Sequence, residues 1–225
     1  MEEMIFINLQ GHRIEQTTSG SDIKVRIGGK DVLLSDLNMV SQEHRGAVAG
    51  LLSYYMKDAG ISVYAKGMIP IGDNPIGTAG LKEYGEIQML QLLLVTKTSG
   101  NKINEIMNNK YNLINVFVHE GEHKSQNTDP SKLGLKGPIR EIYAIQAQME
   151  HSSYSKTTKR FQESTMGYLM KQINNLSMSD TAVTKIIDKA NSLNKNYRID
   201  YNRYGGAPDA YTIKVVEIYI CIMGF

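Results

Sequence analysis

Apolar residues along this chain follow two spacings, and each spacing predicts a different element. Between residues 41 and 59 they recur every three or four positions, and Gly60 follows where a helix would end. The same spacing predicts helices over residues 159–176 and 179–193. Short runs rich in β-branched residues predict strands. They cover residues 4–9, 23–27, 32–34, 61–65 and 211–223.

A further apolar stretch leads into a motif that carries chemistry. Leu113, Val116 and Phe117 have the spacing of a buried helical stripe, and the next residues read His-Glu-Gly-Glu-His over 119–123. Side chains four residues apart lie on one face of a helix, so His119 and His123 can bind one Zn²⁺ together. Residues 124–127 are polar, and we expect them to fray into a loop.

A Gly-Pro pair predicts where the next helix begins. Gly137 and Pro138 close a loop rich in helix breakers, and proline is tolerated in a first helical turn. Glu141 then lies in the opening turn of a helix predicted over residues 139–150. A catalytic zinc site needs a third protein ligand beside an open position, and Glu141 is our candidate.

The role of Glu141 and the identity of the third ligand have alternative interpretations. A second interpretation is that Glu141 only stabilises the start of the helix, where the helix dipole attracts negative charge. Glu150, next to His151, is the rival third ligand, and Glu163 is a weaker one.

The motif His119-Glu120-x-x-His123 followed by Glu141-x-x-Ala144 resembles the gluzincin group of zinc metallopeptidases, over residues 84–150. More narrowly, the small size of the chain and Gln126 make it similar to compact metallopeptidase domains of bacterial polymorphic toxins and related effectors. The resemblance implies that the two histidines and Glu141 bind Zn²⁺. It implies that Glu120 is the general base, which takes a proton from water and passes it to the leaving amine. Members often add a residue that stabilises the oxyanion, and the candidates here are Tyr143, His151, Tyr154 and Tyr204.

The fold that we expect is α+β: a zincin-like metallopeptidase domain with a small mixed sheet packed on helices. We expect a single domain over residues 1–225, divided into N-terminal strands and a helix (1–83), a catalytic core (84–150), and C-terminal helices with a closing strand (151–225). The closing strand is predicted to pair with the N-terminal strands, because its long apolar run suggests burial. Residues 86–96 fit a helix or a strand equally well. In zincins a strand beside the catalytic helix pairs with extended substrate.

The composition of the chain narrows the classes of molecule that it is expected to bind. A hydrophobic share of 41% and a charged share of 21% are those of a globular protein. The net charge of +2 does not predict a nucleic-acid partner, and the single Cys rules out a disulfide framework within the chain. No apolar run has the length of a membrane span and the first residues are acidic, so we expect no membrane partner and cytoplasmic synthesis without a signal peptide. Export by a dedicated secretion system would fit the toxin resemblance.

The sequence therefore predicts a zinc-dependent endopeptidase, a toxin or effector domain that acts on a protein or peptide substrate. A separate immunity protein would restrain it if the toxin resemblance holds. The alternative is a non-catalytic, metal-stabilised protein-binding module. A structural zinc site is closed by four protein ligands, whereas a catalytic site keeps one position open.

Overall fold

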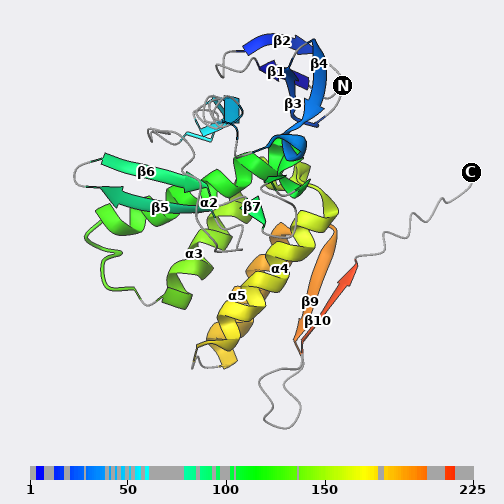
Figure 1. Cartoon of the computed structure of the whole chain (residues 1–225). Helices are drawn as coiled ribbons and strands as arrows, with labels where there is room; N and C mark the ends of the chain where they lie inside the picture. Colours follow the sequence, from blue (N-terminus) through cyan, green and yellow to red (C-terminus); the bar gives the residue numbers. More distant parts are fainter. Residues whose placement is uncertain are drawn as a thin grey trace, which may run out of the picture. The chain divides into compact units, whose positions relative to one another are not determined.

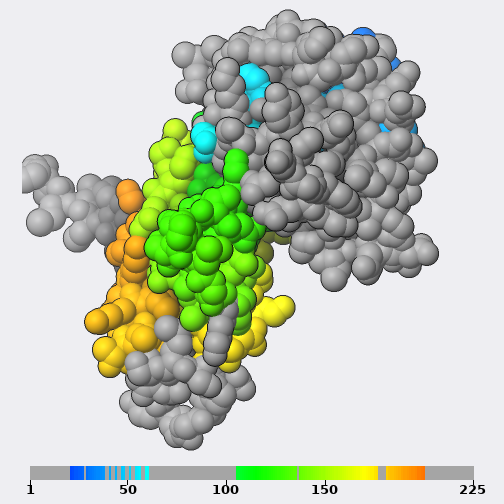
Figure 2. All heavy atoms as spheres, turned by 90° about the vertical axis from the view of Figure 1, so that its left-hand side faces the viewer, coloured from blue at the N-terminus to red at the C-terminus, as the bar shows by residue number. Residues whose placement is uncertain are grey.

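The computed structural model (Figure 1) describes these residues: 4–7, 13–17, 21–27, 29–38, 41, 44, 47, 48, 51, 54–56, 59, 60, 79–84, 87–92, 95–96, 102–103, 105–135, 137–176, 180–201 and 211–215. Side chains are described within these ranges from residue 21 to 60 and from 105 to 200, except at Asp180. They are coloured in Figure 2. Contacts group the chain into two compact units, residues 1–133 and 134–225. The prediction of a single domain therefore stays a prediction.

The first unit opens with the small mixed sheet that the sequence predicted. Its strands are β1 (Met4–Ile7), β2 (Arg13–Thr17), β3 (Lys24–Ile27) and β4 (Lys30–Leu33). They lie in the order β2-β1-β3-β4, with β1 and β3 parallel and the other pairs antiparallel. β3 and β4 form a hairpin in which Gly29 has φ +78°, a conformation that glycine adopts without strain. Strand β2 was not predicted.

The helix predicted over residues 41–59 is confirmed at its described residues from 44 to 56, and Ser41 and Ala59 are described but not helical. Residues 44, 47, 48, 51 and 54–56 are helical, and Val48, Leu51, Tyr55 and Met56 are buried. The amide of Ala59 donates to the carbonyl of Tyr55, and Gly60 follows with φ +71°, as expected at a helix end. The strand predicted over residues 61–65 lies outside the described residues.

The ambiguous stretch 86–96 contains a strand. β5 (Ala79–Tyr84) and β6 (Ile87–Leu92) pair antiparallel, and β5 runs along helix α2 (Lys110–Thr128), as Figure 1 shows. Leu, Met and Gln favour helix in isolation, so pairing with β5 overrides local propensity here. The shorter strands β7 (Val95–Thr96) and β8 (Lys102–Ile103) and the 3₁₀ turns η1 (Leu34–Asp36) and η3 (Glu105–Asn108) complete the unit.

Helix α2 is anchored at its first residues. The Asn109 side chain accepts hydrogen bonds from the amides of Tyr111 and Asn112, at 2.9 and 3.2 Å, which caps the helix. The same side chain donates to Ser21 Oγ at 2.8 Å, and the amide of Lys110 donates to the Ser21 carbonyl. The residue before the cap, Asn108, accepts from the amide of Ile23. These bonds fix the start of α2 to the segment that leads into β3.

The second unit is mostly helical. It contains α3 (Gly137–Glu150), η4 (Tyr154–Lys156), α4 (Lys159–Asn174), α5 (Asp180–Leu193), β9 (Tyr197–Tyr201) and β10 (Tyr211–Val215). All three α-helices were predicted, and the β9–β10 hairpin packs on α4 and α5 (Figure 1). The core of this unit includes Ile145, Tyr154, Met166 and Leu169. In the described part of the chain, no helix is long and apolar enough to cross a membrane.

The prediction for the last strand was wrong in its pairing. Over residues 211–215, the described part of the predicted strand, β10 pairs with β9 in a two-stranded sheet, and no described residue of it pairs with the N-terminal strands. Strand β9 alternates between buried Tyr197 and Ile199 and exposed Arg198, and it was not predicted. A partner close in sequence costs less chain entropy than one nearly two hundred residues away, which favours the hairpin.

Candidate metal centre

His119 and His123 face each other on the second half of α2. Their Nε2 atoms are 3.1 Å apart and their rings meet edge to face, with 4.7 Å between the ring centroids. Two nitrogens that bind one tetrahedral zinc ion at 2.0–2.1 Å lie roughly 3.3 Å from each other. The pair is therefore already spaced to share an ion.

Glu120 follows His119 and is 5% exposed. A carboxylate in a buried position is costly unless it has a partner, and Glu120 has one in this structure. The expected fraying after His123 does not occur, because the helix continues to Thr128. The Thr128 hydroxyl donates to the carbonyl of Lys124 at 3.0 Å. The longer helix holds the motif away from a helix end.

Glu141 lies on α3 but past its first turn, because the helix begins two residues earlier than predicted. His119, His123 and Glu141 each offer one ligand atom, and these atoms all lie within 4.8 Å of one another. All three side chains are partly buried, so solvent has access to the group. Two imidazole nitrogens and one carboxylate oxygen are the donor set of a His₂Glu zinc site.

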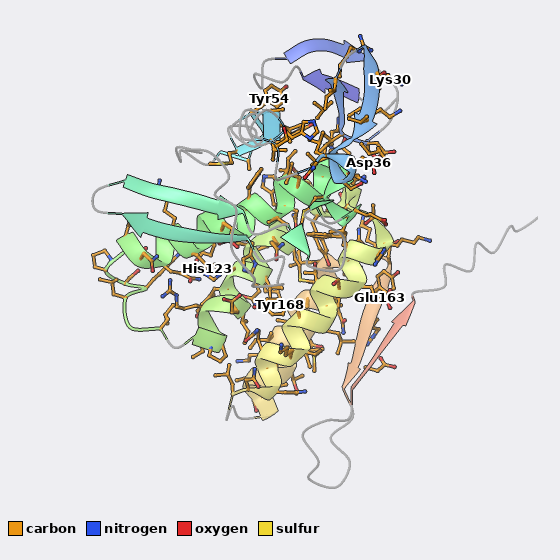
Figure 3. The ribbon with its side chains drawn as sticks, in the orientation of Figure 1. Lys30, Asp36, Tyr54, His123, Glu163 and Tyr168 are labelled. Carbon is orange, nitrogen blue, oxygen red and sulfur yellow. The ribbon has the colours of Figure 1, made fainter. Side chains whose placement is uncertain are left out.

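The rival third ligands are placed differently. Glu150 is half-exposed and forms an ion pair with Lys189, and Glu163 is exposed on α4 (Figure 3). In the part of the chain that the structure describes, the group that could hold a metal contains Glu141 and neither of these two.

The four oxyanion candidates have different surroundings. Tyr143 on α3 is 49% exposed, and His151 Nδ1 lies 2.9 Å from the Ser153 hydroxyl. Tyr154 is fully buried in the core of the second unit, where its hydroxyl accepts from Asn194 Nδ2 at 2.9 Å, and burial raises the pKa of its phenol. Tyr204 lies outside the described residues. No observation selects one of them, and they stay predictions.

Sequence reasoning missed Tyr168. Tyr168 lies on helix α4 (Figure 3). Its hydroxyl donates to Glu141 Oε2 at 3.0 Å, and the residue is 39% exposed. The signal in the sequence was weak, because Tyr168 is one of 13 tyrosines and stands 27 residues beyond Glu141.

Sequence reasoning also missed the surroundings of His123. Its Nδ1 lies 3.0 Å from Gln126 Oε1, and Gln126 Nε2 lies 3.4 Å from Glu122 Oε1. Lys132 Nζ donates to the same Glu122 oxygen at 2.8 Å. We call these three residues, Gln126, Glu122 and Lys132, the His123 relay. They come from one turn of α2 and the turn that follows it.

Comparison with known proteins agrees with this geometry. A family model described as Metallopeptidase toxin 2 matches residues 5–204, which includes the His-His-Glu group and parts of both units. Neither the curated proteins nor the solved structures yielded a match. The resemblance to metallopeptidase domains of toxins, drawn from the motif, is confirmed over most of the chain. The chain is thus a member of the Metallopeptidase toxin 2 family, and it carries that family's hydrolase chemistry on an intact His-His-Glu metal site.

Proposed function

We propose that this metallopeptidase is a zinc-dependent endopeptidase in which His119, His123 and Glu141 hold the ion and Glu120 is the general base. The observation that carries the proposal is the close approach of the three ligand atoms, within 4.8 Å, with the two Nε2 atoms 3.1 Å apart. Among the residues that the structure describes, the group has three protein ligands, which leave one tetrahedral position open, the arrangement of a catalytic site. This favours an enzyme over the metal-stabilised binding module.

The donor set supports zinc as the metal. Imidazole nitrogen suits zinc, copper, iron and nickel, whereas magnesium and calcium prefer sites made of oxygen ligands alone. A combination of two imidazoles with one carboxylate is well known for catalytic zinc. The partly buried position of all three residues also suits a centre that must admit substrate.

Glu120 is the residue that moves protons in this proposal. When bound, zinc lowers the pKa of water in the open position and polarises the scissile carbonyl. Glu120 accepts a proton from the attacking water and later donates it to the leaving amine nitrogen, so that the peptide bond breaks into a carboxylate and an amine. Its position supports this role, because it directly follows the proposed ligand His119 on α2 and is buried.

Tyr168 joins the candidates for binding the developing oxyanion. Its hydroxyl lies beside a proposed metal ligand, where it donates its single hydrogen to Glu141 Oε2 at 3.0 Å, and binding an oxyanion would require it to redirect that hydrogen. Among the candidates named from sequence, Tyr143, His151 and Tyr204 stand beside it as proposals. Tyr154 is less suited, since it is fully buried in the core of the second unit.

The family also supports proposals about partners. A peptidase acts on a protein or peptide, and we propose that extended substrate pairs with the β5–β6 hairpin, since β5 runs along the helix that carries the motif. A toxin must leave the cell that makes it, so we propose export by a dedicated secretion system. We also propose an immunity protein that blocks the site in the producing cell.

Metal content tests the centre directly. Protein purified without added metal should carry about one zinc per chain, measured by elemental analysis. His119→Ala and His123→Ala should each lose the ion, while His151→Ala, matched in residue type but not a proposed ligand, should retain it. Natively purified protein with no zinc, and no zinc uptake on titration, would contradict the proposal.

A further inference from the structure

Within the His123 relay, the hydrogen-bonding partners determine the orientation of the Gln126 amide. The Glu122 carboxylate can only accept hydrogen bonds, and it faces the Lys132 ammonium at 2.8 Å and the Gln126 amide at 3.4 Å. The amide must therefore present its nitrogen to Glu122. Its oxygen is left to face His123 Nδ1 at 3.0 Å.

This orientation decides which nitrogen of His123 carries hydrogen. An amide oxygen accepts and cannot donate, so the imidazole must donate from Nδ1. In the neutral ring Nε2 then has no hydrogen and keeps its lone pair. That lone pair points toward His119 Nε2, 3.1 Å away, where the metal is proposed to bind.

Burial protects the hydrogen bonds of the His123 relay from competition by water. Gln126 is 2% exposed, and the side chains of Glu122 and Lys132 are 18% and 33% exposed. Water competes poorly for hydrogen bonds at such positions, so a broken bond at Gln126 would leave a polar group unsatisfied. Lys132 also donates to Ser125 Oγ at 3.1 Å, which fixes the far end of the relay to the same helix.

We propose that Gln126 is a positioning residue for the metal centre: it holds His123 in the tautomer that binds metal through Nε2, and Glu122 with Lys132 holds Gln126. The inference rests on the proposed zinc site. Metal-binding histidines are commonly oriented by an acceptor on the second ring nitrogen, and loss of that acceptor typically lowers metal affinity about 10- to 100-fold. Here the acceptor comes from the same helix, three residues on, and is itself held by an ion pair.

The first experiment measures zinc affinity by competition with a chromophoric chelator. Gln126→Leu keeps the volume of the side chain and removes the acceptor, and it should weaken zinc binding about 10- to 100-fold. Gln172→Leu, which removes a buried glutamine from α4, is the matched control and should bind zinc as the wild type does. Lys132→Met should give a smaller loss, because Glu122 would still accept from Gln126.

A swap of the two relay residues separates positioning from packing. Gln126→Glu alone places two carboxylates side by side and should bind zinc more weakly than the wild type. The double variant Glu122→Gln with Gln126→Glu restores a donor beside an acceptor, and the new carboxylate accepts from His123 Nδ1. Recovery of at least tenfold relative to Gln126→Leu is expected.

The second readout needs no metal. In the zinc-free wild type, the ¹⁵N shifts of the His123 ring should report hydrogen on Nδ1, and Gln126→Leu should shift the population toward Nε2. Wild-type protein that binds no zinc would overturn the proposed function and this inference together. Wild-type protein that binds zinc with the same affinity as Gln126→Leu, or that shows the Nε2–H tautomer at His123, would overturn the inference alone.

Discussion

The two halves of helix α2 differ in whether they bury apolar side chains. In residues 110–117 the apolar side chains of Leu113, Ile114 and Phe117 are buried in the core of the first unit, beside three buried polar ones, Lys110, Asn112 and Asn115. In residues 118–128 the buried positions are Glu120 and Gln126. Buried polar groups do not add stability in the way that buried apolar groups do, so the second half is built for another purpose.

The contrast teaches how one helix serves both stability and chemistry. The first half fixes the helix to the core and to the segment before β3, while the second half presents the motif on a backbone that is already held. A site needs residues whose positions are locked by their surroundings, and a packed first half supplies that. Substitutions in the two halves should therefore have separable effects.

The largest effect is expected at Glu120. Glu120→Gln keeps the shape of the side chain and removes the base, so kcat/KM on a peptide substrate should fall about 10²- to 10⁴-fold. Zinc content and the urea midpoint should stay close to those of the wild type. Glu163→Gln, on the exposed face of α4, serves as the control and should keep full activity. Equal activity of Glu120→Gln and wild type would overturn the assignment of the base.

A substitution at Phe117 tests the first half of α2. Its side chain is fully buried, and Phe117→Ala should lower the free energy of unfolding by about 3–5 kcal/mol, because it leaves a cavity in the core. Urea unfolding followed by circular dichroism measures the loss. Phe117→Leu should cost less, and Leu133→Ala, at a residue that is 60% exposed, should change stability by no more than about 0.5 kcal/mol. A Phe117→Ala variant as stable as the wild type would break the distinction between the halves.

Glu141 lies outside α2, and a substitution there tests whether it is the third metal ligand. Glu141→Ala removes a proposed ligand and should weaken zinc binding by about 2 kcal/mol or more, roughly thirtyfold. A carboxylate that only stabilises a helix start would contribute about 0.3–1 kcal/mol, and to folding instead of metal binding. Glu150→Ala is the control, since that rival ligand pairs with Lys189. Greater zinc loss in Glu150→Ala than in Glu141→Ala would move the third ligand.

The helices were predictable from sequence because periodic burial and end signals agree along them. Helix α3 begins at Gly137, two residues before its predicted start, and α4 begins at residue 159 as predicted. The strands were harder, since β2 and β9 are short and their pairing depends on partners that local sequence does not name. The wrong pairing of the final strand has this same cause: an apolar run predicts burial but not a neighbour.

The candidate site likewise contains some residues that the sequence predicts and others that only the folded chain reveals. His119, His123 and Glu141 were found because ligand chemistry demands fixed residue types at a helical spacing. Gln126 was noted in the sequence, but its contact with His123 Nδ1 depends on side-chain rotamers within α2. Tyr168 depends on the packing of α4 on α3, which no local pattern encodes. Supporting residues are therefore visible only in the folded chain.

The smallest effect is expected at Asn109, where α2 begins. Asn109→Ala removes the cap and the bond to Ser21, and should lower the free energy of unfolding by about 1 kcal/mol, measured by urea unfolding. Asn109→Asp keeps a capping acceptor and loses the donor to Ser21, so the difference between the two variants isolates the cap. Zinc affinity should be unchanged in both, because the motif lies ten residues further along the helix. Loss of zinc in the folded Asn109→Ala variant would show that the first half of α2 sets the geometry of the second, and the two halves would then have to be treated as one.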